Sequence, residues 1–278
     1  MPHSSICHAA LAGFFLILSS IWQAEAGTVS LAAHRAIYDL MLDQSEQAPD
    51  MADMSGRIVM EFSGSRCSGY SVALRFVTEI SDQAGDLRVT DARTQTYEEG
   101  DGASFKFSNE TFIDENLSEQ SRGKANRTDD GIAVALTKPS KKDFVLDKSI
   151  VFPTAQIVQI IEAAQRDQNF LQIDVYDGSE DGETVYATTV VVGAGSTSSL
   201  DIGDEVAAKE AGVSGLRHWP VTVSYFDQTG EGEQTPIYVM SFILYENGIS
   251  RHLKIDYGDF AIVGRLTGLE MLAPAQCP

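Results

Sequence analysis

Apolar and polar residues alternate with a period of two along most of the chain. Val72, Leu74 and Phe76, for example, are separated by residues that are smaller or polar. Successive side chains of a strand point to opposite faces, so this pattern predicts strands with one buried face. A similar pattern predicts a strand around residues 58–63, and further strands at roughly 30–43, 85–98, 103–114, 119–128, 131–138, 170–177, 184–193, 217–227, 237–246, 249–257 and 260–272.

Short segments rich in Gly, Asp and Asn separate the predicted strands, as at Gly100-Asp101-Gly102 and Glu246-Asn247-Gly248. These residue types favour the tight turns of hairpins. Charge on one face of many strands is typical of an antiparallel sheet that is wet on one side. A sheet of about twelve to fourteen strands has to curl or close to protect its edges. We therefore expect a mainly β fold, a large and strongly bent antiparallel sheet that resembles an open barrel.

One segment has a helical period instead. Ile157, Ile160, Ile161 and Ala164 stand at positions i, i+3, i+4 and i+7, which places them on one stripe of a helix. This predicts one main α-helix, packed in or against the concave face of the sheet.

The boundaries of this helix follow from its flanking residues. Pro153 cannot continue a strand ladder, Thr154 is the predicted N-cap, and the helix is expected to end near Asp167. A later stretch, Gly193–Gly215, is rich in Gly, Ser, Ala and acidic residues. It is either a surface loop or contains a short helix near residues 205–211.

The first 26 residues are predicted to be a signal peptide. The apolar run Ala9–Trp22 is shorter than the roughly 20 residues that span a bilayer, and Ala24-Glu25-Ala26 follows it as an A-x-A cleavage pattern. No repeat or low-complexity linker divides residues 27–278, so the mature chain is expected to be one domain. It has no other stretch of about 18 consecutive apolar residues, and we do not expect it to be an integral membrane protein.

Removal of the signal peptide leaves two cysteines, Cys67 and Cys277. An even pair in an exported chain predicts one structural disulfide. A redox role is a weaker interpretation, because the chain has no C-x-x-C motif.

Acidic residues outnumber basic ones, with 40 Asp and Glu against 20 Lys and Arg and a formal net charge of −20. Nucleic acids and anionic membrane surfaces would repel such a chain. We expect its partners to be cations, cationic proteins or neutral apolar ligands.

Motifs for catalysis are absent from the sequence. There is no G-x-S-x-G nucleophile motif and no complete glycine-rich phosphate loop, and nothing marks a pair among the many carboxylates. The three histidines of the mature chain, His34, His218 and His252, are far apart in sequence and stand among predicted strand residues, which favours structural roles over a zinc site. We predict no enzymatic activity, no cofactor and no metal.

Two segments are candidates for contacts with a ligand or partner. The Asp177–Glu183 segment resembles the start of a calcium loop, but Thr188 stands where the closing acid belongs, so a β-turn with solvated acids is favoured. Asp177 and Ser179 are the candidate contacts there. The second segment contains His34 and Arg35, for which we favour a structural role in a central strand. The alternative is that both face a cleft and hold an anionic head group.

Four features in the same order resemble the EipB family of periplasmic cell-envelope integrity proteins. They are the Leu31–Leu40 strand, the Phe152-Pro153-Thr154 helix start, the Val175–Ser179 turn and the Cys67 and Cys277 pair. The resemblance extends over essentially the whole mature chain. It implies a spiral-like sheet of about fourteen strands around a helix, a Cys67–Cys277 disulfide, and a non-enzymatic role in the Gram-negative envelope. It also implies a periplasmic tetratricopeptide-repeat protein as partner.

Two classes of function follow from these observations. The first is a periplasmic interaction protein that supports envelope integrity through contacts with other proteins. The alternative is a carrier or binder of a lipid or another apolar ligand in the concave face of the sheet.

Overall fold

The computed structural model describes residues 29–45, 51–198, 203, 205–227, 235–275 and 277, so the predicted signal peptide lies outside the described part. One antiparallel sheet of fourteen strands makes up most of it. The strands are β1 (His34–Leu42), β2 (Met51–Ser65), β3 (Gly69–Asp82), β4 (Leu87–Glu98), β5 (Ser104–Ile113), β6 (Asn116–Arg127), β7 (Ile132–Lys138), β8 (Lys142–Leu146), β9 (Phe170–Val175), β10 (Tyr186–Val192), β11 (His218–Asp227), β12 (Tyr238–Tyr245), β13 (Ser250–Asp256) and β14 (Ala261–Met271). The described helices are α1 (Pro153–Gln165) and α2 (Val206–Glu210). Neither of them has the length and hydropathy that a membrane-spanning helix requires.

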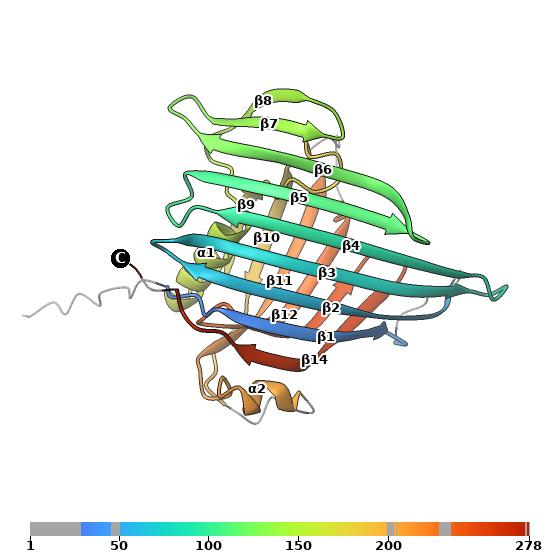
Figure 1. The fold of residues 1–278 in the computed structure, drawn as a ribbon. Coiled ribbons are helices and arrows are strands. Elements are labelled where there is room, and N and C mark those ends of the chain that lie inside the picture. Colours follow the sequence, from blue (N-terminus) through green and yellow to red (C-terminus); the bar gives the residue numbers. More distant parts are fainter. Residues whose placement is uncertain are drawn as a thin grey trace, which may run out of the picture.

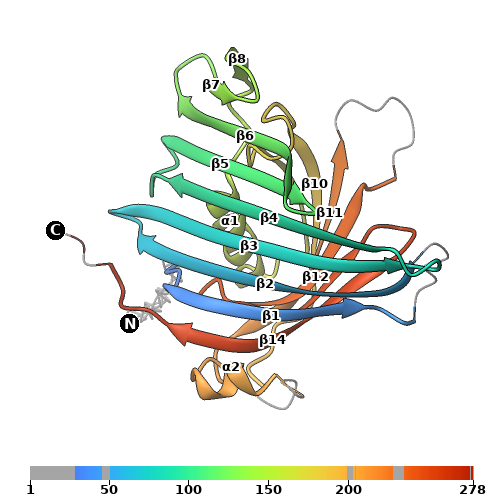
Figure 2. The same cartoon turned by 45° about the vertical axis from the view of Figure 1, so that its right-hand side comes forward.

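The strand order is β8-β7-β6-β5-β4-β3-β2-β1-β14-β13-β12-β11-β10-β9, which places the first and last strands side by side in the middle of the sheet. We call β1–β8 the N-terminal arm and β9–β14 the C-terminal arm. The N-terminal arm and β14 form one broad layer, and the other strands of the C-terminal arm cross behind it with α1 between the two (Figures 1 and 2). The outer strands β8 and β9 are not neighbours in the sheet, so the sheet curls without closing. The predicted fold class, a bent and open-barrel-like sheet, is confirmed.

Helix α1 occupies the concave side of the sheet, as its apolar stripe predicts. Ile160 and Ile161 are fully buried, and they share a core cluster with residues of β9–β12 such as Val190 and Trp219. An apolar stripe on one side of a helix packs against one sheet face, and here that face is formed by β9–β12.

The start of α1 differs from the prediction. Thr154 is not the N-cap, because Pro153 already takes the first helical position and Phe152 is the capping residue, without a capping side chain. The carboxylate of Glu98, at the end of β4, fills that role by accepting hydrogen bonds from the backbone N–H groups of Thr154 (2.8 Å) and Ala155 (3.0 Å). Helix N-termini leave such N–H groups free and favour negative charge. The cap of α1 therefore comes from a strand of the N-terminal arm.

A second contact between the arms is the turn Asp177–Glu183, which we call the closing turn. The carbonyl of Gly178 accepts hydrogen bonds from Asn109 Nδ2 (2.8 Å) and from the hydroxyl of Ser121, both in the N-terminal arm. Just before the turn, the ring of Tyr176 packs edge-on against Phe107, with centroids 5.7 Å apart. Backbone hydrogen bonds between Val151 and the end of β9 run nearby. The closing turn and the adjoining Tyr176 therefore join the C-terminal arm to β5 and β6 of the N-terminal arm.

The Gly193–Gly215 stretch forms the short helix α2, the second of the two predicted alternatives. Glu205, just before α2, is buried where β13 and β14 separate beyond the Leu253–Gly264 pair. Its carboxylate accepts hydrogen bonds from the backbone N–H groups of His252 (3.0 Å) and Leu266 (2.8 Å). It also lies 3.4 Å from the buried guanidinium of Arg251. One carboxylate thus satisfies the donors that the separation of the two strands leaves unpaired.

The predicted disulfide between Cys67 and Cys277 is present, with a Cα–Cα distance of 5.7 Å. It ties the C-terminal tail to the β2–β3 turn.

Candidate functional site

An apolar cavity of about 270 Å³ lies between the two arms, beside the first turn of α1. We call it the interior cavity. Nineteen residues of the described part of the chain line it, and none of these is Lys, Arg, Asp or Glu. The N-terminal arm contributes residues such as Phe62 and Leu74, α1 contributes Ile157, and the C-terminal arm contributes Met240 and Leu244. A concave and mostly apolar space with few polar groups is the usual character of a site for a small ligand.

His34 of β1 is one of the few polar residues of this lining. Its side chain is buried, with 2% of the residue exposed, and Nδ1 lies 2.7 Å from the carbonyl oxygen of Ala32. A carbonyl only accepts hydrogen bonds, so Nδ1 is the donor and Nε2 has a free lone pair on the neutral ring. Burial lowers the pKa of His34, and the hydrogen bond to Ala32 opposes this only in part, which favours the neutral ring. No hydrogen-bond partner of Nε2 is present among the described residues.

Tyr38, two residues further along β1, also lines the cavity. Its hydroxyl donates a hydrogen bond to the carbonyl of Ser250 (2.7 Å). Burial raises the pKa of Tyr38 to about 12. This phenol therefore stays neutral and is already occupied, which distinguishes it from the unpaired nitrogen of His34.

Arg35 lies on the other face of β1, where it pairs with Glu61 (2.8 Å) and Glu270 (2.9 Å) at the surface. The alternative in which His34 and Arg35 together hold an anionic head group is therefore wrong. Consecutive side chains of a strand point to opposite faces, and this strand has no bulge between the two residues.

The other candidate residues, Asp177 and Ser179, lie in the closing turn. The backbone N–H of Ser179 donates a hydrogen bond to Asp177 Oδ1 (2.9 Å), so the segment is a turn, as predicted. Asp177 is half-buried rather than solvated, and burial raises the pKa of its carboxyl. Within the described residues, no three His, Cys, Asp or Glu side chains converge as metal ligands.

A group of tyrosines adjoins Asp177. The rings of Tyr225 and Tyr238 stack with centroids 4.4 Å apart, and Tyr186 meets Tyr225 edge-on at 6.0 Å. Burial raises the pKa of all three tyrosines, and the charge of Asp177 adds to the effect. Tyr225 also lines the interior cavity, so this group forms one side of the same interior.

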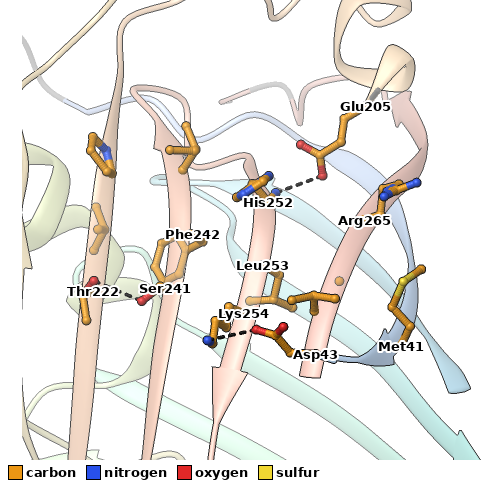
Figure 3. Close-up of a pocket in the computed structure, with 15 residues that line it drawn as sticks. Met41, Asp43, Glu205, Thr222, Ser241, Phe242, His252, Leu253, Lys254 and Arg265 are labelled. Carbon is orange, nitrogen blue, oxygen red and sulfur yellow. Dashed lines mark hydrogen bonds and ion pairs between the residues drawn. The ribbon is translucent and has the colours of Figure 1, made fainter. Parts of the chain in front are cut away.

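A second hollow, of about 500 Å³, is lined by residues of β1 and β11–β14 and by Glu205. In Figure 3 the Glu205 carboxylate points towards His252, and Lys254 reaches Asp43. The Lys254–Asp43 distance is 3.0 Å. Because the charged groups of this hollow are already paired, we regard the interior cavity as the better candidate site.

Several residues of the site were not identified from the sequence. Glu98 and Tyr38 occur in alternating strand sequences that do not reveal their partners. Their roles depend on contacts with segments far away in the sequence, α1 for Glu98 and Ser250 for Tyr38. An acidic residue at a position that the alternation assigns to the buried face is the one signal that could have pointed to Glu98.

Comparison with known proteins agrees with this fold. A family model described as EipB-like matches residues 25–273. The cell envelope integrity protein EipB of Brucella abortus (strain 2308) is 41% identical over 246 residues, which is 88% of this chain and 86% of that protein. The crystal structure of a beta-barrel-like protein of the domain of unknown function DUF1849, also from Brucella abortus, covers 88% of this chain and all of its own length, with a TM-score of 0.82 and 41% identity. The sequence resemblance is thus confirmed, and the chain belongs to the EipB-like family.

Proposed function

We propose that this protein supports the integrity of a Gram-negative cell envelope from the periplasm, as a binding protein without catalytic activity. The observation that supports this most directly is 41% identity, over 88% of the chain, to a protein named for envelope integrity. The predicted signal peptide and the Cys67–Cys277 disulfide fit an oxidising compartment outside the cytoplasm.

The test is deletion of the gene in its own host, followed by growth on detergent and on a large antibiotic that an intact envelope excludes. We expect the deletion to sensitise the cells, the full chain to restore resistance, and a chain without residues 1–26 to fail. Unchanged resistance after deletion would refute the envelope role. Rescue by the chain without residues 1–26 would refute the periplasmic location.

Protein–protein contact is the proposed mode of action, with a periplasmic tetratricopeptide-repeat protein as the partner that the family resemblance implies. The net charge of −20 supports contacts with basic patches, which weaken as salt rises. Affinity capture from crosslinked cells tests this mode. We expect an envelope protein to be enriched and to be lost at high salt when the crosslinker is omitted. Recovery of no envelope protein above a mock capture would count against it.

A second function, binding of an apolar ligand, is favoured by the interior cavity between the arms. Protein purified from a periplasm and examined by native mass spectrometry and organic extraction should contain a co-purifying lipid. The absence of such a lipid, together with an unchanged melting temperature on addition of fatty acids and phospholipids, would exclude this function.

A further inference from the structure

The interior cavity combines an apolar wall with one unsatisfied acceptor. Its volume of about 270 Å³ is lined, among the described residues, by side chains without formal charge. At roughly 30 Å³ for a water-sized group, it has room for about nine non-hydrogen atoms. A short aliphatic chain therefore matches its size and its polarity.

Nε2 of His34 adds a requirement for a donor. This nitrogen is buried and has no hydrogen-bond partner within the described residues, and His34 is one of the residues that line the cavity. An unpaired buried polar atom destabilises a structure, and a ligand that supplies a donor removes that cost. Since Nδ1 already donates to Ala32, the ligand has to donate and Nε2 has to accept.

The charge of the surroundings sets a second requirement. No cationic side chain of the described residues lines the cavity, and the nearby carboxylate of Glu98 holds the first turn of α1. A buried anionic head group would have no partner there, which makes its binding unfavourable.

We propose that the interior cavity binds one uncharged aliphatic chain of about eight carbons, whose hydroxyl group donates a hydrogen bond to Nε2 of His34. This proposal rests on the second proposed function and specifies the chemical class of its ligand.

Three probes of similar size test separately whether the ligand needs a hydrogen-bond donor and whether it has to be uncharged. 1-Octanol has a donor, heptyl methyl ether has the same number of non-hydrogen atoms without a donor, and octanoate at pH 8 has a charge. With delipidated full-length protein, we expect calorimetry to show the tightest binding for octanol. The ether should bind about fivefold more weakly, as for the loss of one hydrogen bond. Octanoate should bind at least about tenfold more weakly, because its charge would be buried without a partner.

Variants assign these effects to named residues. In His34→Phe, octanol and the ether should bind equally well, whereas Arg35→Gln, on the opposite face of the same strand, should behave as the wild type. Val72→Phe should fill the cavity and abolish binding of all three probes. Melting curves establish that each variant is folded, and Val72→Phe tests the location even if His34→Phe does not fold.

The proposal is overturned if no probe binds, if octanoate binds best, if Val72→Phe binds as the wild type does, or if His34→Phe keeps the preference for octanol. If these probes fail while a lipid still co-purifies from the periplasm, the ligand class is wrong and the proposed apolar-ligand function stands. If no probe binds and no lipid co-purifies, both the proposed ligand class and the proposed apolar-ligand function are wrong.

Discussion

At the scale of single residues, the face of the strand decides what a polar side chain does. His34 and Arg35 are neighbours, yet one is buried against the cavity and the other forms ion pairs at the surface. Asp91 in β4 also lies on the solvent-facing side of its strand, where it pairs with Arg75 and Arg93. The strand alternation therefore predicts burial well, but it does not predict which partner a polar residue meets.

Asp91 provides a prediction about pH. Arg75 and Arg93 donate hydrogen bonds to its carboxylate (2.9 and 2.7 Å), which lowers its pKa to about 2. A carboxyl group with a lowered pKa stabilises the fold above its unfolded pKa of about 4, and this contribution disappears as the pH falls towards 2. Asp91 is 14% exposed but both arginines are half exposed, so we expect solvent screening to reduce the contribution to about 1 kcal/mol.

Asp91→Asn should therefore lower the free energy of unfolding in urea by about 1 kcal/mol at pH 7 and by much less at pH 2.5. The exposed Asp86→Asn serves as the control and should change little at either pH. An equal loss for Asp91→Asn at both pH values would mean that the ion pair is not the cause.

At the scale of elements, a buried carboxylate lies at the start of each described helix. The residues of α1 define its apolar stripe, and Pro153 defines its start. The carboxylate that caps it, from Glu98, lies in β4 of the N-terminal arm. Glu205 precedes α2 and binds backbone groups of β13 and β14. Each carboxylate compensates for a place where regular hydrogen bonding ends, at a helix terminus or between separating strands.

Glu98→Ala should destabilise the protein by about 2 kcal/mol, because two N–H groups at the start of α1 lose a charged acceptor. Glu98→Gln keeps an acceptor and should cost less. The neighbouring Glu99 is exposed, so Glu99→Ala is a matched control with little expected effect. Chemical unfolding gives the free energy of unfolding of all three variants. Equal stability of Glu98→Ala and Glu99→Ala would show that the Glu98 cap does not stabilise the protein.

At the scale of the whole molecule, the two arms are held by contacts between residues far apart in sequence. In the closing turn, Gly178 binds the β5–β6 hairpin and Glu183 forms an ion pair with Lys142 of β8. At the centre of the sheet, the last strand pairs with the first. We expect the sheet to remain curled only while both kinds of contact are intact.

Gly178 shows how close the arms approach in the closing turn. Its φ is +67°, and a Cβ at this position would lie 2.4 Å from the ring of Phe107. Gly178→Ala should therefore cost about 2–4 kcal/mol, from backbone strain together with displacement of the turn. Gly212 has a similar φ of +75° but open space around it, so Gly212→Ala should cost only about 1 kcal/mol. Similar losses in urea unfolding would show that contact with Phe107 does not matter.

The disulfide spans 210 residues, for which loop-entropy arithmetic gives an upper limit of about 5 kcal/mol and experience with other proteins about 2–4 kcal/mol. Cys67→Ser should therefore lower the melting temperature under oxidising conditions and have no effect when a reductant is present. A loss of the same size in both conditions would mean that the crosslink is not what stabilises the fold.

Most strands and the main helix were predictable because each buries one face, and burial leaves a local period in the sequence. The Cys67–Cys277 pair was also predictable, since export leaves only two cysteines. Strand β8 (Lys142–Leu146) was not predicted, because it is a short edge strand with little burial and therefore no clear alternation.

The sequence by itself thus determined the fold class, the helix and the crosslink, all of which depend on local pattern or on residue counts. Only the tertiary structure decided that β14 lies beside β1, that Glu98 caps α1, and that His34 faces a cavity while Arg35 does not. Such relationships depend on how segments far apart in the chain meet, and a pattern within one segment contains no information about the partner that it will meet.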